Sequence, residues 1–317
     1  MLTLCSKIRI GGAEFGGVHE VVVKRSIYEL AATASIKVPV TAVLRQKGVP
    51  PTRVETARQI DVGDPVEIQL GYNGIYSWEF RGFVKVVNLC TPLEIICEDW
   101  FYQTRSRNVT LQGRTTLTDV LTQCGLTIGY CASLTLSSLQ VDNKPVSWVL
   151  AKLKTEYGLS VFFDMDGRIY AGEIYKVVSE AVKYRLRYNV IKDDELKYHR
   201  ADDMRLKIKA VCIYKDGTKV EASIGADDGI EKTLYFYDVA DQNELAALAV
   251  AELKRYCFDG YTGKIETFLW PPASPTMLAE IDDEVYSQRN GRYYIESVET
   301  RFGTGGGRRT VEIGIRL

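Results

Sequence analysis

Hydrophobic and polar residues alternate along most of the first hundred residues, which is the pattern of strands with one buried face. The alternation is clear in residues 34–44, where Ile36 and Val38 fall on the same side of the predicted strand. Turn-forming residues recur at the spacing of roughly 8–12 residues that is typical of an all-β sandwich or barrel. Residues 45–57 are polar and contain Pro50-Pro51, so they predict a long loop rather than a strand.

Helical spacing replaces this alternation after Trp100. Residues 116–124 predict a short helix whose N-cap is Thr115 or Thr116. Residues 145–157 predict a second helix, with Pro145 at its first position and Gly158 as its stop signal. This part of the chain therefore reads as a small α+β segment.

The segment closes with a hairpin, because Asp166-Gly167 separates two short apolar runs. An Asp-Gly pair in that place predicts a type I′ turn, and this explains the acidic residues better than a calcium loop does.

Strand patterns return from Val182 onward, interrupted by one long helix. Asp241 and Glu244 have the spacing of a capping box at the start of that helix. The apolar stripe that predicts its buried face consists of Leu245, Leu248, Ala249 and Leu253.

One β pattern occurs twice in the chain. The first copy runs from Val62 to Ile96 and the second from Ile281 to Ile315. Asn73-Gly74 and Asn290-Gly291 occupy matching places and each predicts a tight hairpin turn. The repeat indicates two similar β units in one polypeptide.

These patterns predict a mainly β (α+β) fold with two β-barrel modules flanking a small α+β insert. We expect the first module in residues 1–104, the insert in residues 105–178, and the second module, with its long helix, in residues 179–317.

Composition narrows the possible functions. The formal net charge of −1 argues against a general coat for nucleic acid, which needs a basic surplus. No apolar run reaches the ~20 residues of a membrane helix. The seven cysteines are scattered without a CxxC pair, which predicts buried free thiols, no metal site and synthesis in a reducing bacterial cytoplasm.

Motifs that would indicate an enzyme are missing from the sequence. His19 and His199 lack the neighbours of a catalytic or metal-binding histidine. The glycines at 303–307 lead into an alternating strand, whereas a phosphate cradle needs a helix N-terminus. We therefore expect no catalytic residue, no cofactor and no enzymatic activity.

Two groups of exposed-type residues are candidates for a protein interface, which favours Arg and Tyr. One lies in the predicted long loop, residues 45–59, and the other near the chain end. Together they are Arg45, Gln46, Arg53, Arg58, Tyr293, Arg301, Arg308 and Arg309.

The order of several short motifs carries a resemblance to a known family. In the first module these are residues 62–66 (VGDPV) and 80–82 (FRG). In the second half the motifs are residues 189–194, 198–200, 215–219, 233–237, 260–263, 290–294, 302–303 and 309–314. This series resembles the baseplate (tail) hub proteins of contractile-tailed bacteriophages, including late control protein D and the hub half of type VI secretion spike proteins.

The resemblance implies a structural role in a phage tail, a prophage tail or a related injection machine. In that family two tail-tube-like barrels flank an α/β insert, and three chains form a pseudo-sixfold ring between a hexameric tube and a trimeric spike. It implies that DNA or an effector passes through the ring, and that the protein ends up in a virion tail or injection machine. Since the sequence stops at Leu317, just after the second barrel, we expect the spike to be a separate protein.

Two other classes remain open at this point. One is a tail-associated protein that binds or hydrolyses peptidoglycan or another cell-wall carbohydrate, with the insert as the binding part. The other is a single-strand nucleic-acid binder, which the near-neutral charge disfavours.

Overall fold

A large antiparallel β-sheet dominates the structure, a computed structural model in which residues 2–46, 49–113, 115–136, 139–214, 218–237, 239, 241–287 and 290–317 are described. The mainly β class predicted from the sequence is confirmed. Within the described residues the strands follow an open path, so two closed barrels are not confirmed.

The sheet has fourteen strands, contributed by both ends of the chain. Seven come from the first hundred residues, here called module 1: β1 Leu4–Ile10, β2 Ala13–Phe15, β3 Glu20–Ser26, β4 Thr33–Val38, β7 Pro65–Tyr72, β8 Ile75–Asn88 and β9 Leu93–Glu98. Seven come from the second half, here called module 2: β17 Ala181–Arg185, β18 Val190–Lys192, β19 Leu196–His199, β23 Gly260–Thr267, β24 Leu278–Asp282, β25 Gly291–Gly303 and β26 Gly306–Arg316.

The two modules have the same strand order. In module 1 the neighbours run β1–β7–β8–β9–β4–β3, and in module 2 they run β17–β24–β25–β26–β23 with β18 and β19 last. Counted along the chain without the three-residue β2, and with β18 and β19 taken as one strand, each order is first, fourth, fifth, sixth, third, second. The modules differ in polarity, because β1 pairs antiparallel with β7 whereas β17 pairs parallel with β24, and β2 of module 1 has no counterpart among the module 2 strands given above.

The two predicted Asn-Gly turns have different outcomes. Asn73 and Gly74, at φ 54° and 83°, form the tight connection between β7 and β8, as predicted. The prediction for Asn290-Gly291 is wrong, since β24 ends at Asp282 and β25 begins at Gly291. There Asn290 Oδ1 instead accepts a hydrogen bond from the Asp283 amide at 2.7 Å.

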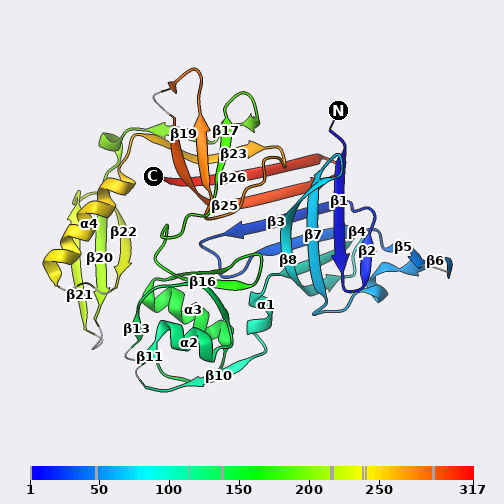
Figure 1. The fold of residues 1–317 in the computed structure, drawn as a ribbon, viewed down its shortest axis with the longest axis horizontal. Helices are drawn as coiled ribbons and strands as arrows, with labels where there is room; N and C mark the ends of the chain where they lie inside the picture. Colours follow the sequence, from blue (N-terminus) through cyan, green and yellow to red (C-terminus); the bar gives the residue numbers. More distant parts are fainter. Residues whose placement is uncertain are drawn as a thin grey trace.

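The loop prediction for residues 45–57 is wrong where the structure describes them, because residues 45–46 and 49–55 belong to two paired strands. Strands β5 (Thr41–Gln46) and β6 (Val49–Glu55) pair with each other, and the short 3₁₀ helix η1 (Thr56–Gln59) leads back to module 1. Pro50 and Pro51 fit in β6 because the pairing with β5 is irregular between Leu44 and Gln46, and neither proline has a partner in the regular ladder there. This hairpin, here called the arm, projects from the right-hand end of the molecule in Figure 1.

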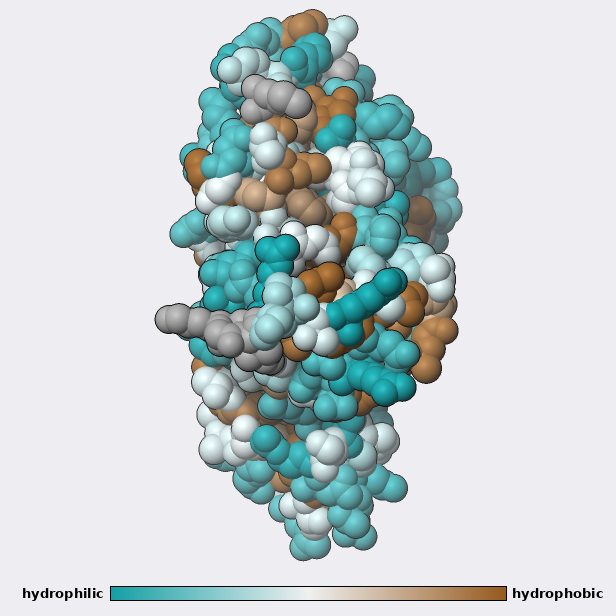
Figure 2. Space-filling view, turned by 90° about the vertical axis from the view of Figure 1, so that its right-hand side faces the viewer, coloured by the Kyte–Doolittle hydropathy of each residue, from teal (hydrophilic) through white to brown (hydrophobic). Residues whose placement is uncertain are grey.

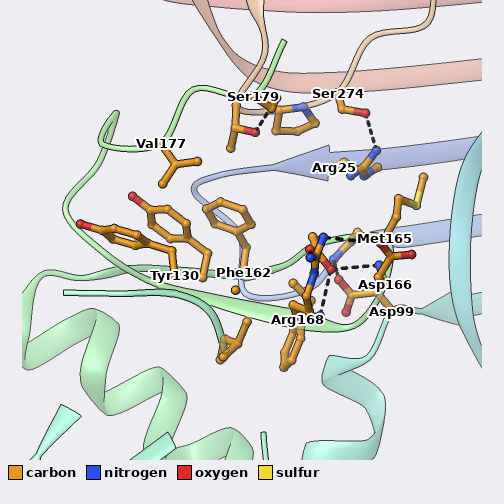
Figure 3. A pocket seen from close by; sticks show the side chains of 18 of the residues that line it. Arg25, Asp99, Tyr130, Phe162, Met165, Asp166, Arg168, Val177, Ser179 and Ser274 are labelled. Atoms are coloured by element: carbon orange, nitrogen blue, oxygen red, sulfur yellow. Dashed lines mark hydrogen bonds and ion pairs between the residues drawn. The ribbon is translucent and has the colours of Figure 1, made fainter. Parts of the chain in front are cut away.

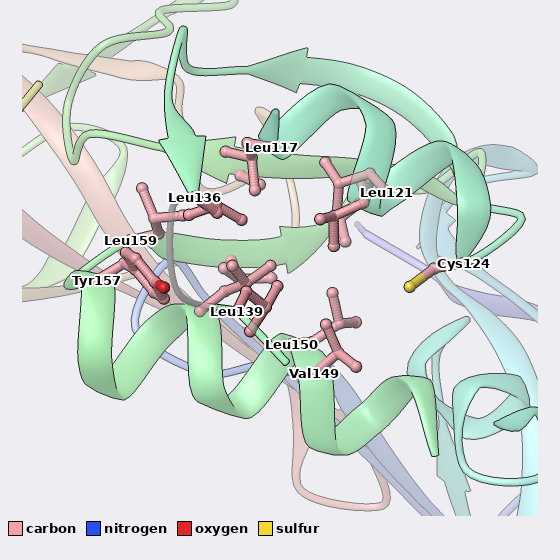
Figure 4. Close-up of a cluster of buried hydrophobic side chains, with 14 of the residues drawn as sticks. Leu117, Leu121, Cys124, Leu136, Leu139, Val149, Leu150, Tyr157 and Leu159 are labelled. Atoms are coloured by element: carbon pink, nitrogen blue, oxygen red, sulfur yellow. The ribbon is translucent and has the colours of Figure 1, made fainter. Parts of the chain in front are cut away.

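The segment between the modules folds around its own core, at the lower side of Figure 1. Its helices are α1 Phe101–Thr104, α2 Leu117–Gln123 and α3 Val146–Tyr157. Its strands are β10 Asn108–Leu111, β11 Thr115–Thr116, β12 Thr127–Cys131, β13 Thr135–Leu136, β14 Val141–Pro145, β15 Ser160–Phe163 and β16 Arg168–Gly172. Figure 4 shows side chains of α2 and α3, such as Leu121 and Leu150, pointing toward one another.

The helix boundaries of this segment agree closely with the sequence. Thr116 is the N-cap of α2 and accepts the Asp119 amide, and Gly158 ends α3 at φ 64°. Pro145 is the N-cap residue of α3, directly before the first helical residue Val146, and not the first helical residue as predicted. The type I′ prediction is wrong, because four residues, 164–167, connect β15 to β16 and only Gly167 among them has a positive φ.

A separate small sheet is inserted into module 2 between β19 and β23, after the short 3₁₀ helix η2 (Ala201–Asp203). It consists of β20 Leu206–Ile213, β21 Lys219–Gly225 and β22 Ile230–Phe236, covered by α4 Gln242–Tyr256. Asp241 caps α4 by accepting the amides of Asn243 and Glu244. The sequence of Lys215-Asp216-Gly217 also predicts a turn, and these residues, part of the 215–219 motif, lie outside the described part of the chain.

The predicted apolar stripe of α4 supplies a test of this packing. Leu245 is fully buried against the small sheet, whereas Leu248 is 36% exposed. We expect Leu245→Ala to lower the free energy of unfolding by about 2–5 kcal/mol, because it leaves a cavity. Leu248→Ala on the same helix is the matched control, and its urea unfolding midpoint should move far less. Equal losses from the two variants would contradict this packing.

Candidate functional site: an assembly interface

The two modules join through direct strand pairing. Strand β3 of module 1 pairs antiparallel with the second half of β25 of module 2, from Ser26 opposite Ser297 to Glu20 opposite Gly303. The first half of β25 pairs with β24 along the same edge. This junction, here called the seam, makes one continuous sheet out of strands whose paired residues are 271 to 283 positions apart in the chain.

A buried ion pair lies beneath the seam. Arg309 is fully buried and donates to the carboxylate of Glu79, which is 4% exposed. Thr300 Oγ1 donates to the same carboxylate at 2.9 Å, and Ser77 Oγ does so at 2.8 Å. The second Arg309 amino group donates to the carbonyl of Pro271 at 2.8 Å. Glu79 and Ser77 belong to module 1 and the others to module 2, so this network fastens the modules to each other.

Apolar and polar contacts extend the seam to both sides. Leu269 and Phe302 of module 2 insert into the hydrophobic core of module 1. Tyr72 Oη donates to the Gly307 carbonyl at 3.1 Å, and Arg25 Nη1 donates to Ser274 Oγ at 2.9 Å. The connection between β23 and β24, residues 268–277, therefore reaches across onto module 1.

The exposed face of the sheet around the seam carries charges in pairs. The ion pairs are Lys37–Glu20 at 2.7 Å, Lys24–Glu299 at 3.5 Å, Arg308–Glu266 at 3.6 Å, Lys264–Glu312 at 3.9 Å, and Arg301–Glu299. Each pair contributes little to stability because it is solvated. Their effect is on the surface potential, since each of these basic groups has an acidic partner and the face presents no basic stripe for a polyanion.

A cavity of about 680 Å³ lies where module 1, the insert and module 2 meet (Figure 3). Tyr130 stacks on Tyr170 with ring centroids 4.9 Å apart, and Phe162 stacks on Tyr170 at 4.6 Å. Opposite these rings lie Arg25 and Asp99. Burial raises the pKa of Asp99 to about 7, although two backbone amides donate to its carboxylate. An aromatic wall facing polar groups is a general feature of small-ligand sites.

Sites of other kinds find no support in the part of the chain that is described. No group of three or more His, Cys, Asp or Glu side chains there is arranged to hold a metal ion. No helix there is long and apolar enough to cross a membrane. All seven cysteines are free, as predicted, although only Cys97, Cys124 and Cys212 are buried.

The structure separates the predicted interface residues into three places. Arg45, Arg53 and Arg58 are exposed on the arm and η1, where Arg58 pairs with Glu55 at 2.7 Å. The backbone of Gln46 ends β5, and its side chain lies outside the described part. Figure 2 views the molecule from the arm side and shows hydrophobic residues as patches among hydrophilic ones.

The residues near the chain end divide between the surface and the interior. Arg301 and Arg308 lie opposite each other on the exposed sheet face that carries the ion pairs around the seam, here called the paired-charge face. Tyr293 and Arg309 are fully buried, Tyr293 in the core of module 2 and Arg309 in the seam. Their side chains are thus not available to a partner, because strand alternation turns them inward. Glu79 was not among the predicted site residues, and the available signal was that it is the one acidic residue of β8.

Comparisons with known proteins give the fold a context. The structure is similar to a 43 kDa tail protein of prophage MuSo2 from Shewanella oneidensis, with TM-score 0.58, 15% identity and coverage of 97% of each chain. It is similar to a tail protein from Neisseria meningitidis, with TM-score 0.61, 10% identity and coverage of 99% of this chain and 97% of that one. It is also similar to an Escherichia coli component of the type VI secretion system, with TM-score 0.58, 10% identity and coverage of 98% and 76%.

The chain therefore has the fold of phage tail proteins and of a type VI secretion component, and the resemblance predicted from the sequence is confirmed at the level of the fold. No protein-family model matches the sequence. No curated protein matches it either.

The seam network predicts an asymmetric response to mutation. Arg309→Met leaves the Glu79 carboxylate buried without its cation, which should lower the free energy of unfolding by about 3–5 kcal/mol. Arg308→Met is the control, since its side chain is one position away but faces solvent. Adding Glu79→Met to Arg309→Met should recover part of the loss in urea unfolding. Equal effects at 308 and 309 would show that the buried pair does not hold the modules together.

Proposed function

We propose that this protein is a non-enzymatic structural hub in the tail of a phage, a prophage or a tail-derived injection machine. Three copies form a ring with six similar β units, which joins a hexameric tail tube to a trimeric spike. The ring forms part of a conduit for DNA or an effector. The protein is made in the bacterial cytoplasm and is then built into the virion tail or injection machine.

The observation that carries this proposal is the repeated strand order within one chain. A protein with two modules of the same topology contributes two similar units to any ring, so threefold assembly matches sixfold symmetry. We further propose that the units are two barrel-like modules, residues 1–104 and 179–317, around an insert of residues 105–178. The fold shared with phage tail proteins and a type VI secretion component supports the same placement.

The paired-charge face suits the inside of such a ring. A conduit for a polyanion works best when its wall neither binds nor repels the cargo, and paired charges give that wall. Arg301 and Arg308 then face the lumen, and the arm with Arg45, Gln46, Arg53 and Arg58 faces a neighbouring chain.

A second candidate function is binding of a cell-wall carbohydrate, and the cavity with stacked Tyr130, Tyr170 and Phe162 is the observation that favours it. Sugar rings pack on aromatic side chains while their hydroxyls bond to charged groups. Retention on insoluble peptidoglycan that is lost in Phe162→Ala would support this function, and clearing in a zymogram would indicate hydrolysis.

The ring proposal is tested by mass in solution. Light scattering of the purified chain, alone or together with candidate tube and spike proteins, should detect a species that contains three copies of the chain. A single-chain mass under every one of these conditions would overturn the proposed function.

The arm supplies a second test. Replacing residues 43–53 by a short Gly-Ser connection removes most of β5 and β6, which pair only with each other among the described elements. We expect the circular dichroism spectrum and melting temperature to stay close to those of the intact chain while trimer formation falls at least tenfold. Unchanged trimer formation would remove the arm from the interface.

A further inference from the structure

The strand pairing that joins the two modules within one chain can also occur between two copies of the chain. We infer that the contact between copies repeats the seam, so that the free edge of β18 and β19 in one copy pairs antiparallel with the Lys85–Asn88 edge of β8 in the next. This inference rests on the proposed ring and specifies which edges close it.

The strand order identifies the equivalent strands. In the count given above, the second strand of each module stands at the end of that module's strand order. It is β3 in module 1 and β18 with β19 in module 2. The fifth strand of each module is its long central one, β8 or β25. The seam joins β3 to β25, so its equivalent joins β18 and β19 to β8.

Both of these equivalent edges are open in the described part of the chain. Strand β8 pairs with β7 as far as Phe83, and the Val84 amide donates to the Asp64 carbonyl at 2.9 Å. Beyond that point, residues 85–88 pair only with β9. Strands β18 and β19 pair only with β23. Open strand edges readily pair with another chain, so natural proteins rarely leave them without a partner or protection.

The paired-charge face also continues across the proposed contact. Val86 lies in a row of neighbours with Ile96, Ser35 and Val22. Lys192 lies opposite Glu266, which pairs with Arg308. Val86 and Lys192 therefore belong to the same side of the sheet, as an uninterrupted ring wall requires.

Exposed apolar residues flank both edges. Leu89, directly after β8, is 81% exposed, and Tyr188, two residues before β18, is 77% exposed. These are the largest exposures among the large hydrophobic side chains of the described residues. Val285, in the connection between β24 and β25, is 62% exposed. Covering such side chains gives the edge pairing a hydrophobic contribution.

The same equivalence assigns the arm. The arm joins the third and fourth strands of module 1, and residues 268–277 join those of module 2. Residues 268–277 reach across the seam to Tyr72 and Arg25 of module 1. The arm therefore reaches across the contact between copies, onto module 2 of the chain that donates β18 and β19.

Cysteine crosslinking tests this contact. Val86→Cys and Lys192→Cys are combined with Cys90→Ser, which removes the exposed native thiol. A short bismaleimide is used because β8 and β18 each carry a register shift, and its reach tolerates a displacement of two residues. We expect covalent bands that end at three chains on denaturing gels, and each single variant should remain monomeric on the same gel.

The control replaces Lys192→Cys by Ile230→Cys in β22, a position that is 76% exposed but lies on neither edge. Chance collisions would crosslink it as well, so equal bands would overturn the inference. As a second measurement, Ile191→Asp should shift the wild-type trimer toward monomer at least tenfold, whereas Ile230→Asp should not.

The outcomes separate this inference from the proposed function. A wild-type trimer in which the Val86–Lys192 pair does not crosslink and Ile191→Asp has no effect would overturn the edge pairing and leave the hub role standing. A wild type that stays monomeric with tube and spike proteins would overturn both.

Discussion

The hydrogen-bonded ion pair between Glu79 and Arg309 is the constraint on which the relation of the two modules depends. A buried arginine has to be matched by an acceptor, and here the acceptors come from module 1 and from the 268–277 connection at once. Sliding β3 along β25 by one pair would separate these groups and leave charge buried on both sides. The network therefore adds to the buried face of β3, with Val21 and Val23, in fixing the register of the seam.

Fixing that register has consequences beyond the pair itself. It sets the angle between modules, aligns the exposed face into one surface, and places Leu269 in the core of the other module. The insert lies outside this frame with a largely separate core, whereas the core of the β20–β22 sheet and α4 also takes in Tyr294 of β25 and Ile315 of β26.

Local features of the chain could be predicted from the sequence, and features that depend on distant pairing could not. The caps at Thr116 and Gly158 were predictable because a few neighbouring residues determine them. The hairpin turn predicted at Asn290-Gly291 was wrong because the same dipeptide can occur in a tight turn or at the end of a longer connection. Tyr293 and Arg309 read as surface residues, since nothing local reveals which side of β25 and β26 faces a core. The seam itself depends on β3 finding a strand near the opposite end of the chain, which no local pattern encodes.

Strand β17 runs parallel to its neighbour β24, whereas its counterpart β1 runs antiparallel to β7, so the two modules differ at this outer strand. Reversing one outer strand moves its connections to the opposite rim, so successive units around a circle would alternate between two kinds of border. In the ring proposed above, one rim would then offer six near-identical attachment points and the other rim three. The reversed strand would give a single polypeptide a different symmetry on each side of that ring.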